Sequence, residues 1–364
     1  MTGGRQVGKT TMLKYLDPKR NYVSLDILEN RHLAQRDPQL FLQQFKPPII
    51  IDEVQYAPEL FPYLKAKIDQ SDAKGQYWLI GSQKFSLMRN VSESLAGRIG
   101  IFELAAFSQA EIAGHTDWQP FKPSIELIQS RSAEAKPVDL TEIYEQIWLG
   151  SYPALNEVKG AFWEDFYNSY LQTYIERDIR DVVQMKHEHE FLQVLRLLAA
   201  RTGQLLNYTD IARDVGITSV TVKSWLGLLE ASGIIFFLEP YFVNINKQII
   251  KTPKIYFMDT GLVAFLTGWR TAETLSLGAM KEQILETYVI SEIRKSWMYN
   301  GKRALIFYFR DKKKHEIDLL IEENGLIYTI EIKSNSNPTI KDCKNFSVLA
   351  GFTSNKIAME LLYL

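Results

Sequence analysis

A phosphate-binding loop at the start of the chain places the strongest constraint on its fold. Residues 3–10 read GGRQVGKT and fit the pattern G-x-x-x-x-G-K-[ST] through Gly3, Gly8, Lys9 and Thr10. The glycines allow the backbone to curl so that successive N–H groups point at phosphate oxygens. We expect Lys9 to reach the β- and γ-phosphates and Thr10 to place its hydroxyl on Mg²⁺. The expected nucleotide-binding residues are Gly3, Gly4, Arg5, Gln6, Val7, Gly8, Lys9, Thr10 and Thr11.

Four short apolar segments after this loop predict a parallel sheet. They span residues 21–26, 47–53, 77–82 and 99–104, and helical patterns lie between them. The segment 47–53 shows no alternation, as expected of a strand that is covered on both faces. This order predicts an α/β fold with a P-loop NTPase sheet.

Acidic residues end the most apolar of these segments. Ligands of open parallel sheets collect at the carboxyl ends of the strands. We therefore expect Asp52 to bind the Mg²⁺ shell and Glu53 to orient or deprotonate the attacking water. Ser82, at the end of the next strand, is expected to contact the γ-phosphate. Arg98 is a candidate for stabilising transition-state charge, within the subunit or across a subunit boundary, although spacing alone equally fits a surface arginine.

The chain resembles a known family over nearly its whole length, apart from an expected amino-terminal segment. The segments TGGRQVGKTT, IIIDEVQYAPELF, LIGSQKFSLM and SESLAGRI, in this order, resemble a prokaryotic group of AAA-type ATPases with a C-terminal domain of unknown function. The usual loop of that group has proline where this chain has Gly4. The resemblance implies ATP and Mg²⁺ as ligands, with Lys9, Thr10, Asp52, Glu53, Ser82 and Arg98 in the roles given above.

The strand that normally precedes a phosphate-binding loop is the main departure from this resemblance. Only Met1 and Thr2 precede Gly3. An interior strand cannot be lost without leaving unpaired backbone groups. The alternatives are a truncated gene product, a start codon placed too late, and a relic loop. We favour an incomplete amino-terminal segment and expect weak or absent ATP binding in the chain as printed.

Composition limits the remaining function classes. The 364 residues suffice for two or three domains, and the net charge of −1 gives no overall attraction to nucleic acid. No apolar run is long enough to span a membrane, and the amino terminus does not resemble a signal peptide. The single cysteine, Cys343, fits a reducing cytosol. These features predict a cytoplasmic protein with no membrane partner.

The middle of the chain predicts a connector, a helical segment and a helix-turn-helix. We expect domains at 1–114 (ATPase), 115–140 (connector), 141–190 (helical), 191–268 (winged-helix-like) and 269–364. Thr209 and Thr218 are expected to cap two short helices on either side of a turn at Gly216. Ser219, Thr221, Lys223 and Ser224 are expected on the exposed side of the second helix, and Lys247, Lys251 and Lys254 on the following hairpin. DNA contact through phosphates and a packing or protein-binding role are equally supported.

The last segment predicts a hairpin with an acidic cluster. A turn at Asn324-Gly325 places Asp318 opposite Glu331 and Glu316 opposite Lys333. Helix 279–299 adds Glu286 on an apolar face, where a carboxylate needs a metal or a lysine as partner. Glu286, Asp318 and Glu331 are candidate metal ligands and Lys333 a candidate catalytic residue. The spacing resembles the D…E-x-K core of restriction-endonuclease-like nucleases, and this resemblance implies an α/β domain of that kind at residues 269–364. The alternative is a solvent-facing hairpin with an ion pair between Glu316 and Lys333.

These features favour an ATP-binding protein and ATP hydrolase whose C-terminal region binds or cuts nucleic acid. Two alternatives remain. One is a nucleotide-gated module that binds DNA or protein without catalysis, and the other is a metal-dependent nuclease with a regulatory ATP site. DNA and a second copy of the chain are the candidate macromolecular partners.

Overall fold

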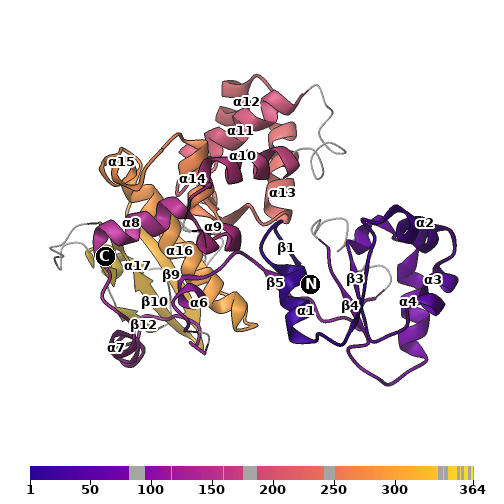
Figure 1. The fold of residues 1–364 in the computed structure, drawn as a ribbon. Coiled ribbons are helices and arrows are strands. Elements are labelled where there is room, and N and C mark those ends of the chain that lie inside the picture. The colour runs from indigo at the N-terminus through magenta and orange to yellow at the C-terminus, as the bar shows by residue number, and fades with distance from the viewer. Residues whose placement is uncertain are drawn as a thin grey trace. The chain divides into compact units, whose positions relative to one another are not determined.

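The computed structural model divides the chain into two compact units (Figure 1). One comprises Met1–Ala106 and Ala231–Gly233, and the other Phe107–Glu230 and Ile234–Leu364. The structure describes residues 1–81, 95–115, 117–158, 160–174, 187–241, 251–334, 339, 343–350, 353, 356–359 and 362–363. Among them, no helix combines the length and apolar character needed to cross a membrane.

The first unit contains the expected parallel sheet. Strands β2 (Asn21–Ser24), β3 (Ile49–Asp52) and β4 (Tyr77–Leu79) pair in parallel in the order β2-β3-β4. Strand β1 (Thr2–Gly3) pairs in parallel with β5 (Glu103–Leu104). All four segments predicted as strands therefore contain one, and each strand is shorter than its predicted segment.

The backbone of Met1 joins these two ladders. Its nitrogen donates to the Leu79 carbonyl at 2.6 Å, and its carbonyl accepts from Gly81 N at 3.3 Å. On the other side, Thr2 N donates to the Phe102 carbonyl at 2.8 Å. Residues 1–3 thus lie between β4 and β5, which is the interior position expected for the strand that feeds a phosphate-binding loop.

Helices cover both faces of this sheet because the first three residues of β3, Ile49, Ile50 and Ile51, are all apolar and buried. Ile49 and Ile51 pack into a core with buried residues of α2 (Leu28–Arg36), α3 (Pro38–Gln44) and α4 (Leu60–Asp69). Ile50 points to the opposite face and packs with Leu13 of α1 (Lys9–Leu16) and with Ile80. The period of two along a strand produces this division.

The second unit begins with a mainly helical region. Its helices are α6 (Gln109–Ile112), α7 (Ile125–Glu134), α8 (Leu140–Leu149), α9 (Pro153–Glu157), α10 (Trp163–Tyr174), α11 (Glu188–Ala200), α12 (Tyr208–Val215), α13 (Ser219–Ala231), α14 (Thr260–Leu266), α15 (Ala272–Leu277) and α16 (Lys281–Tyr299). The aromatic side chains of α10 serve mainly for packing, since Tyr167, Tyr170 and Tyr174 are buried.

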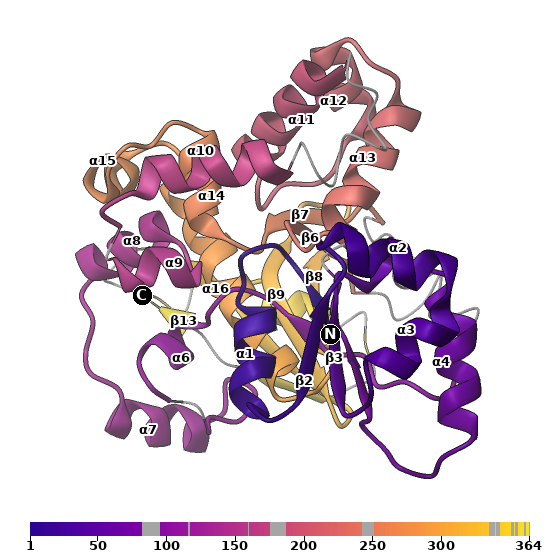
Figure 2. The same cartoon turned by 45° about the vertical axis from the view of Figure 1, so that its right-hand side comes forward.

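Helices α12 and α13 form the expected helix-turn-helix. Gly216 makes the turn with a left-handed backbone (φ 79°), and the Thr218 hydroxyl accepts from Thr221 N at 3.1 Å. The cap of α12 is Asn207 rather than Thr209, because the Asn207 side chain accepts from the amides of Thr209 and Asp210. The antiparallel strands β6 (Ile235–Leu238) and β7 (Lys254–Phe257) follow. Figure 2 shows α11, α12 and α13 grouped together.

The chain ends in a second sheet. Strands β8 (Ile306–Arg310), β9 (Glu316–Glu323), β10 (Leu326–Ile330) and β12 (Lys356–Met359) lie in the order β12-β10-β9-β8, and β11 (Ile332–Lys333) pairs with β13 (Leu362–Tyr363). Helix α17 (Phe346–Leu349) packs on this sheet through Phe346 and Leu349. The predicted hairpin register is confirmed, since Glu323 pairs with Leu326 and Leu319 with Ile330. The fold class is thus confirmed as mixed α/β, with a parallel first sheet, a helical middle and an α/β C-terminal region.

The segment that we expected to be a connector is part of the second unit. It contains α7, and its backbone is bonded to α16. Phe121 N donates to the Ser296 hydroxyl at 3.0 Å, the Phe121 carbonyl accepts from the Trp297 indole at 2.8 Å, and the Trp118 carbonyl accepts from the Asn300 amide at 3.0 Å. These contacts follow from polar side chains on α16 that a reading of residues 115–140 alone does not reveal.

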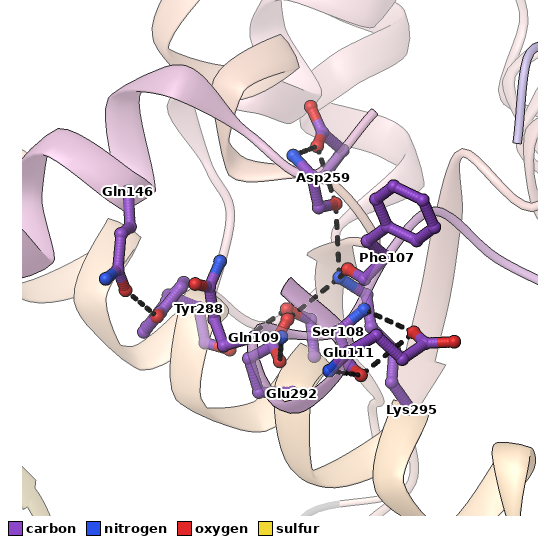
Figure 3. A network of polar contacts seen from close by, with 11 residues as sticks. Phe107, Ser108, Gln109, Glu111, Gln146, Asp259, Tyr288, Glu292 and Lys295 are labelled. Atoms are coloured by element: carbon purple, nitrogen blue, oxygen red, sulfur yellow. Dashed lines mark hydrogen bonds and ion pairs between the residues drawn. The ribbon is translucent and has the colours of Figure 1, made fainter. Parts of the chain in front are cut away.

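A buried polar network fixes the first residues of the second unit (Figure 3). The ammonium group of Lys295 donates to the Phe107 carbonyl at 2.9 Å and to the Ser151 hydroxyl at 3.1 Å, and it pairs with Glu292 at 2.8 Å. Glu292 also accepts from Gln109 N at 2.7 Å. Residues 107–109 are therefore held against α16 by a lysine that is only 2% exposed.

We expect Lys295→Met to destabilise the protein by about 3–5 kcal/mol, because it leaves Glu292 partly buried without its counter-charge. Urea-induced unfolding followed by tryptophan fluorescence measures the loss. The matched control is Lys302→Met, at an exposed lysine just beyond α16, which should change the unfolding free energy by less than about 0.5 kcal/mol. Equal effects of the two substitutions would contradict this account of the network.

Candidate nucleotide site and acidic cluster

The loop between β1 and α1 is curled. Gln6 and Gly8 both have left-handed backbones, with φ 58° and 89°, and α1 begins directly after Gly8. A left-handed conformation is uncommon for a residue with a side chain, so Gln6 stores local strain of the kind found at ligand-binding loops. The curled loop and the helix amino terminus together favour an anion.

Gly3 is required for the approach of β1 to β5. Its φ is 143°, and a Cβ atom there would lie 1.9 Å from the Leu104 carbonyl oxygen. No side chain fits that space. By contrast, a Cβ atom at Gly8 would meet nothing within 4 Å. The two glycines of the motif thus serve different purposes, close packing at Gly3 and a left-handed turn at Gly8.

The side chain of Lys9 folds back into the loop. Its ammonium group donates to the Gly4 carbonyl at 2.6 Å and the Gly3 carbonyl at 3.1 Å, and the residue is only 8% exposed. These bonds enclose a positive charge inside the loop. Its place there agrees with the predicted contact to the β- and γ-phosphates.

Thr10 and Asp52 lie side by side. The Thr10 hydroxyl donates to the Asp52 carboxylate at 2.8 Å, which joins the start of α1 to the end of β3. Asp52 also accepts from its neighbour Glu53 N at 3.0 Å and is largely buried. A hydroxyl and a carboxylate at the carboxyl edge of a parallel sheet are oxygen ligands suited to Mg²⁺, so the residues present fit that ion.

Glu53 has a left-handed backbone with φ 54°. Its carboxylate accepts a hydrogen bond from the side-chain amide of Gln55. A non-glycine residue in this conformation at the end of the central strand is strained. Strain at this position agrees with a functional role for Glu53, which stays a prediction.

The other two candidates of this site are not brought to it by any contact that the structure describes. Ser82 lies outside the described residues. Arg98 is bonded to Asp69, at the end of α4, with 2.6 Å between Nε and the carboxylate oxygen. Both side chains are substantially exposed, so this pair contributes little stability and leaves Arg98 on the surface.

Tyr22 also contacts this site, which was not predicted from the sequence. Its hydroxyl donates to the Asp52 carboxylate at 2.9 Å, and its ring lies against the Lys14 ammonium group. Burial and the Asp52 charge raise the pKa of Tyr22 to about 12. The parallel pairing of Ser24 with Asp52 brings β2 beside β3 and could have revealed this contact, but the register of two parallel strands cannot be read from the sequence.

The second unit brings the predicted acidic residues together. The Lys333 ammonium lies 2.9 Å from Glu331 and 3.9 Å from Asp318. Asp318 also accepts from Ile332 N at 2.9 Å. Burial, followed by the charges of Glu286 and Glu331, raises the pKa of Asp318 to about 8. The two carboxylates thus lie near the same ammonium group, while the β9–β10 ladder ends at Leu319 and Ile330, one pair before the predicted pairing of Asp318 with Glu331.

Two expectations for this cluster are wrong. Lys254 does not decorate the hairpin surface but is buried, with its ammonium 3.0 Å from Glu286 and 2.7 Å from Glu316. Glu316 therefore pairs with Lys254 and Arg310 instead of the predicted Lys333. The ladder of β9 and β10 stops at Leu319 and Ile330, so the directly opposed positions do not continue to Glu316.

No group of three or more His, Cys, Asp or Glu side chains is arranged to hold a metal ion in the described part of the chain. Glu286, the third predicted metal ligand, instead bonds Lys254 and the hydroxyl of Tyr256. The lysine was one of the two partners that the sequence allowed for Glu286. The residues present therefore fit a divalent cation poorly at this position.

The helix-turn-helix exposes part of its second helix. Ser219, Lys223 and Ser224 are exposed and Thr221 is half-buried, in agreement with the predicted outer face. Lys251 is exposed as predicted, whereas Lys247 lies outside the described residues. One lysine on this face of α13 is compatible with phosphate contact and gives no strongly basic surface.

Three family models match the chain. Residues 1–113 match a model described as an AAA domain. Residues 140–273 and 281–361 match models described as domain of unknown function (DUF8612) and domain of unknown function (DUF4143). The expected arrangement of an AAA-type domain followed by a C-terminal domain of unknown function is thus confirmed.

Two further proteins are similar to the chain over most of its length. They are uncharacterised proteins of Mycobacterium tuberculosis and Mycobacterium bovis, each 28% identical over 347 residues, which is 93% of this chain and 71% of theirs. Among solved structures, a point variant of RuvB from Thermotoga maritima aligns with 15% identity over 65% of this chain and 80% of its own. Its TM-score of 0.31 is too low for a common overall fold to follow.

We expect the hydrogen bond between Tyr22 and Asp52 to stabilise the folded protein. Tyr22→Phe keeps the ring against Lys14 and removes only the hydroxyl, so we expect a loss of about 1 kcal/mol in unfolding free energy. Urea denaturation of the full chain measures it. Tyr15→Phe is the matched control, because Tyr15 is 85% exposed on α1. If both variants unfold at the wild-type urea concentration, the hydrogen bond does not stabilise this site.

Proposed function

We propose that the first unit binds ATP with Mg²⁺ at the loop of residues 3–11 and hydrolyses it. The observation that carries this proposal is the pairing of the Thr10 hydroxyl with the Asp52 carboxylate at 2.8 Å, next to a lysine enclosed by its own loop. The match of residues 1–113 to an AAA domain supports the same ligand. Interior pairing of residues 1–3 supports ATP binding, in contrast to the weak or absent binding that we expected from the missing strand.

Each residue of the site has a distinct part in this proposal. The Lys9 ammonium exchanges the carbonyls of Gly3 and Gly4 for the oxygens of the β- and γ-phosphates, which are stronger acceptors because they are charged. Thr10 and Asp52 would hold Mg²⁺, which neutralises phosphate charge when bound. The loop amides and the amino terminus of α1 orient the phosphates.

Glu53 is the candidate for handling the attacking water. It follows Asp52 directly and lies beyond the end of β3, where its left-handed backbone turns the chain. A carboxylate here can accept a proton from water or orient it toward the γ-phosphate. Ser82 is proposed to contact that phosphate.

Arg98 is proposed to act across a subunit boundary of a homo-oligomer. Its exposed pair with Asp69 is weak and can be exchanged for a phosphate on a neighbouring copy. An arginine supplied in this way stabilises charge that develops during phosphoryl transfer.

The ATP site is tested by ATP turnover and by binding of a fluorescent ATP analogue. Lys9→Ala should abolish turnover and weaken binding at least tenfold, whereas Lys19→Ala, at an exposed lysine, should change neither. Glu53→Gln should keep binding and lose turnover by about 10²-fold or more. Wild-type turnover in Lys9→Ala would refute the proposal.

The same assay tests Arg98. Arg98→Ala should lose turnover and keep binding. Mixing Arg98→Ala with Lys9→Ala subunits should restore part of the activity, because one copy supplies the arginine and the other an intact loop. A mixture as inactive as its components would place Arg98 outside a shared site.

We further propose that the helix-turn-helix contacts nucleic acid through α13. The exposed residues Ser219, Lys223 and Ser224 lie together at its start, next to the turn at Gly216. Hydroxyls and an ammonium group in this place suit phosphate oxygens. The nuclease alternative is not favoured, because it requires a divalent cation at Glu286, where Lys254 is already bonded.

Binding of double-stranded DNA at several salt concentrations tests this second proposal. Lys223→Ala should weaken binding for all sequences alike and reduce the slope of log affinity against log salt by about 1. Lys281→Ala, at an exposed lysine on α16, is the control. No measurable DNA binding by the wild type, or an unchanged slope in Lys223→Ala, would favour the packing or protein-binding role.

A further inference from the structure

Lys254 is a buried charge with two acidic partners from different elements. It begins β7, is 3% exposed, and its ammonium group lies 3.0 Å from Glu286 on α16 and 2.7 Å from Glu316 on β9. Tyr256, on the same strand as Lys254, also donates its hydroxyl to Glu286. One side chain thus joins the β6–β7 hairpin to the long helix and to the C-terminal sheet.

The charges around Lys254 are largely balanced within the protein. Four carboxylates, those of Glu286, Glu316, Asp318 and Glu331, lie in this region. Glu286 and Glu316 pair with Lys254, Glu316 also pairs with Arg310, and Glu331 pairs with Lys333. Asp318 accepts from the Ile332 amide and lies 3.9 Å from the Lys333 ammonium. The four carboxylates are therefore paired with three positively charged side chains, those of Lys254, Arg310 and Lys333.

A divalent cation would have to displace part of this arrangement. Isolated buried carboxylates are costly, and a metal ion relieves that cost where no other cation is present. Here the ammonium group of Lys254 lies at the centre of its two acids and would repel a second cation. One oxygen of Glu331 is buried and has no hydrogen-bond partner among the described residues.

We propose that Lys254 takes the place of a divalent cation in this acidic cluster, so that the cluster fixes the β6–β7 hairpin to α16 and β9 instead of binding metal. This inference concerns the second unit alone and is independent of the ATP site. It assigns a structural role to residues whose spacing resembles a nuclease core. Lys254 is then the residue that prevents this cluster from binding a metal ion.

Binding of Mn²⁺ to the full chain without nucleotide tests the inference, with electron paramagnetic resonance counting the bound ions. Asp318→Asn should leave the number of ions bound by the wild type unchanged. Lys254→Met should bind one more Mn²⁺ than the wild type, and the double variant Lys254→Met/Asp318→Asn should lose that ion. Lys251→Met, at an exposed lysine three residues earlier, should behave as the wild type.

Thermal unfolding supplies a second readout. Lys254→Met should lower the melting temperature in metal-free buffer, and Mn²⁺ should raise it again, whereas neither effect is expected in Lys251→Met. Should Lys254→Met not fold, Lys254→Gln, which removes the charge and keeps all four carboxylates, replaces it in both measurements. Loss of a Mn²⁺ ion from the wild type on Asp318→Asn substitution would overturn the proposal. A folded variant without Lys254 that gains no ion would overturn it as well.

Discussion

The proposed nucleotide site depends on one hydrogen bond, from the Thr10 hydroxyl to the Asp52 carboxylate. It can form only if α1 starts beside the end of β3. That placement follows from Thr2 and Gly3, which pair with β5 and bring the loop to the carboxyl edge of the sheet. The absence of a Cβ atom at Gly3 allows this approach. The pairing of β1 with β5 thus positions the loop and α1, and the contact between Thr10 and Asp52 then forms.

The second unit is organised around two buried lysines. Lys295 holds the first residues of that unit against α16, and Lys254 joins β7 to α16 and β9. A buried ammonium group is stable only when its partners are in place, so each lysine selects one arrangement of distant segments. Both depend on acids of the same helix, Glu292 and Glu286. Helix α16 is therefore the element around which this unit is assembled.

Local patterns in the sequence predicted those features that depend on short spacings. They gave the phosphate-binding loop, the strand that ends at Asp52, and the hairpin register set by Asn324-Gly325. They failed where a long-range contact decides. Lys254 resembles a surface lysine because its two partners lie 32 and 62 positions away, on other elements. The contact of Tyr22 was not predicted for the same reason, because the register of two parallel strands cannot be inferred from neighbouring residues in the sequence.

A crystal structure of the full chain with Mg²⁺ and a non-hydrolysable ATP analogue would show where the nucleotide binds. We expect the Lys9 ammonium to leave the carbonyls of Gly3 and Gly4 and to bond the β- and γ-phosphates, with Mg²⁺ on the Thr10 hydroxyl and Asp52 in its shell. An analogue bound elsewhere, or a loop that keeps Lys9 on its own carbonyls at saturating analogue, would contradict this expectation.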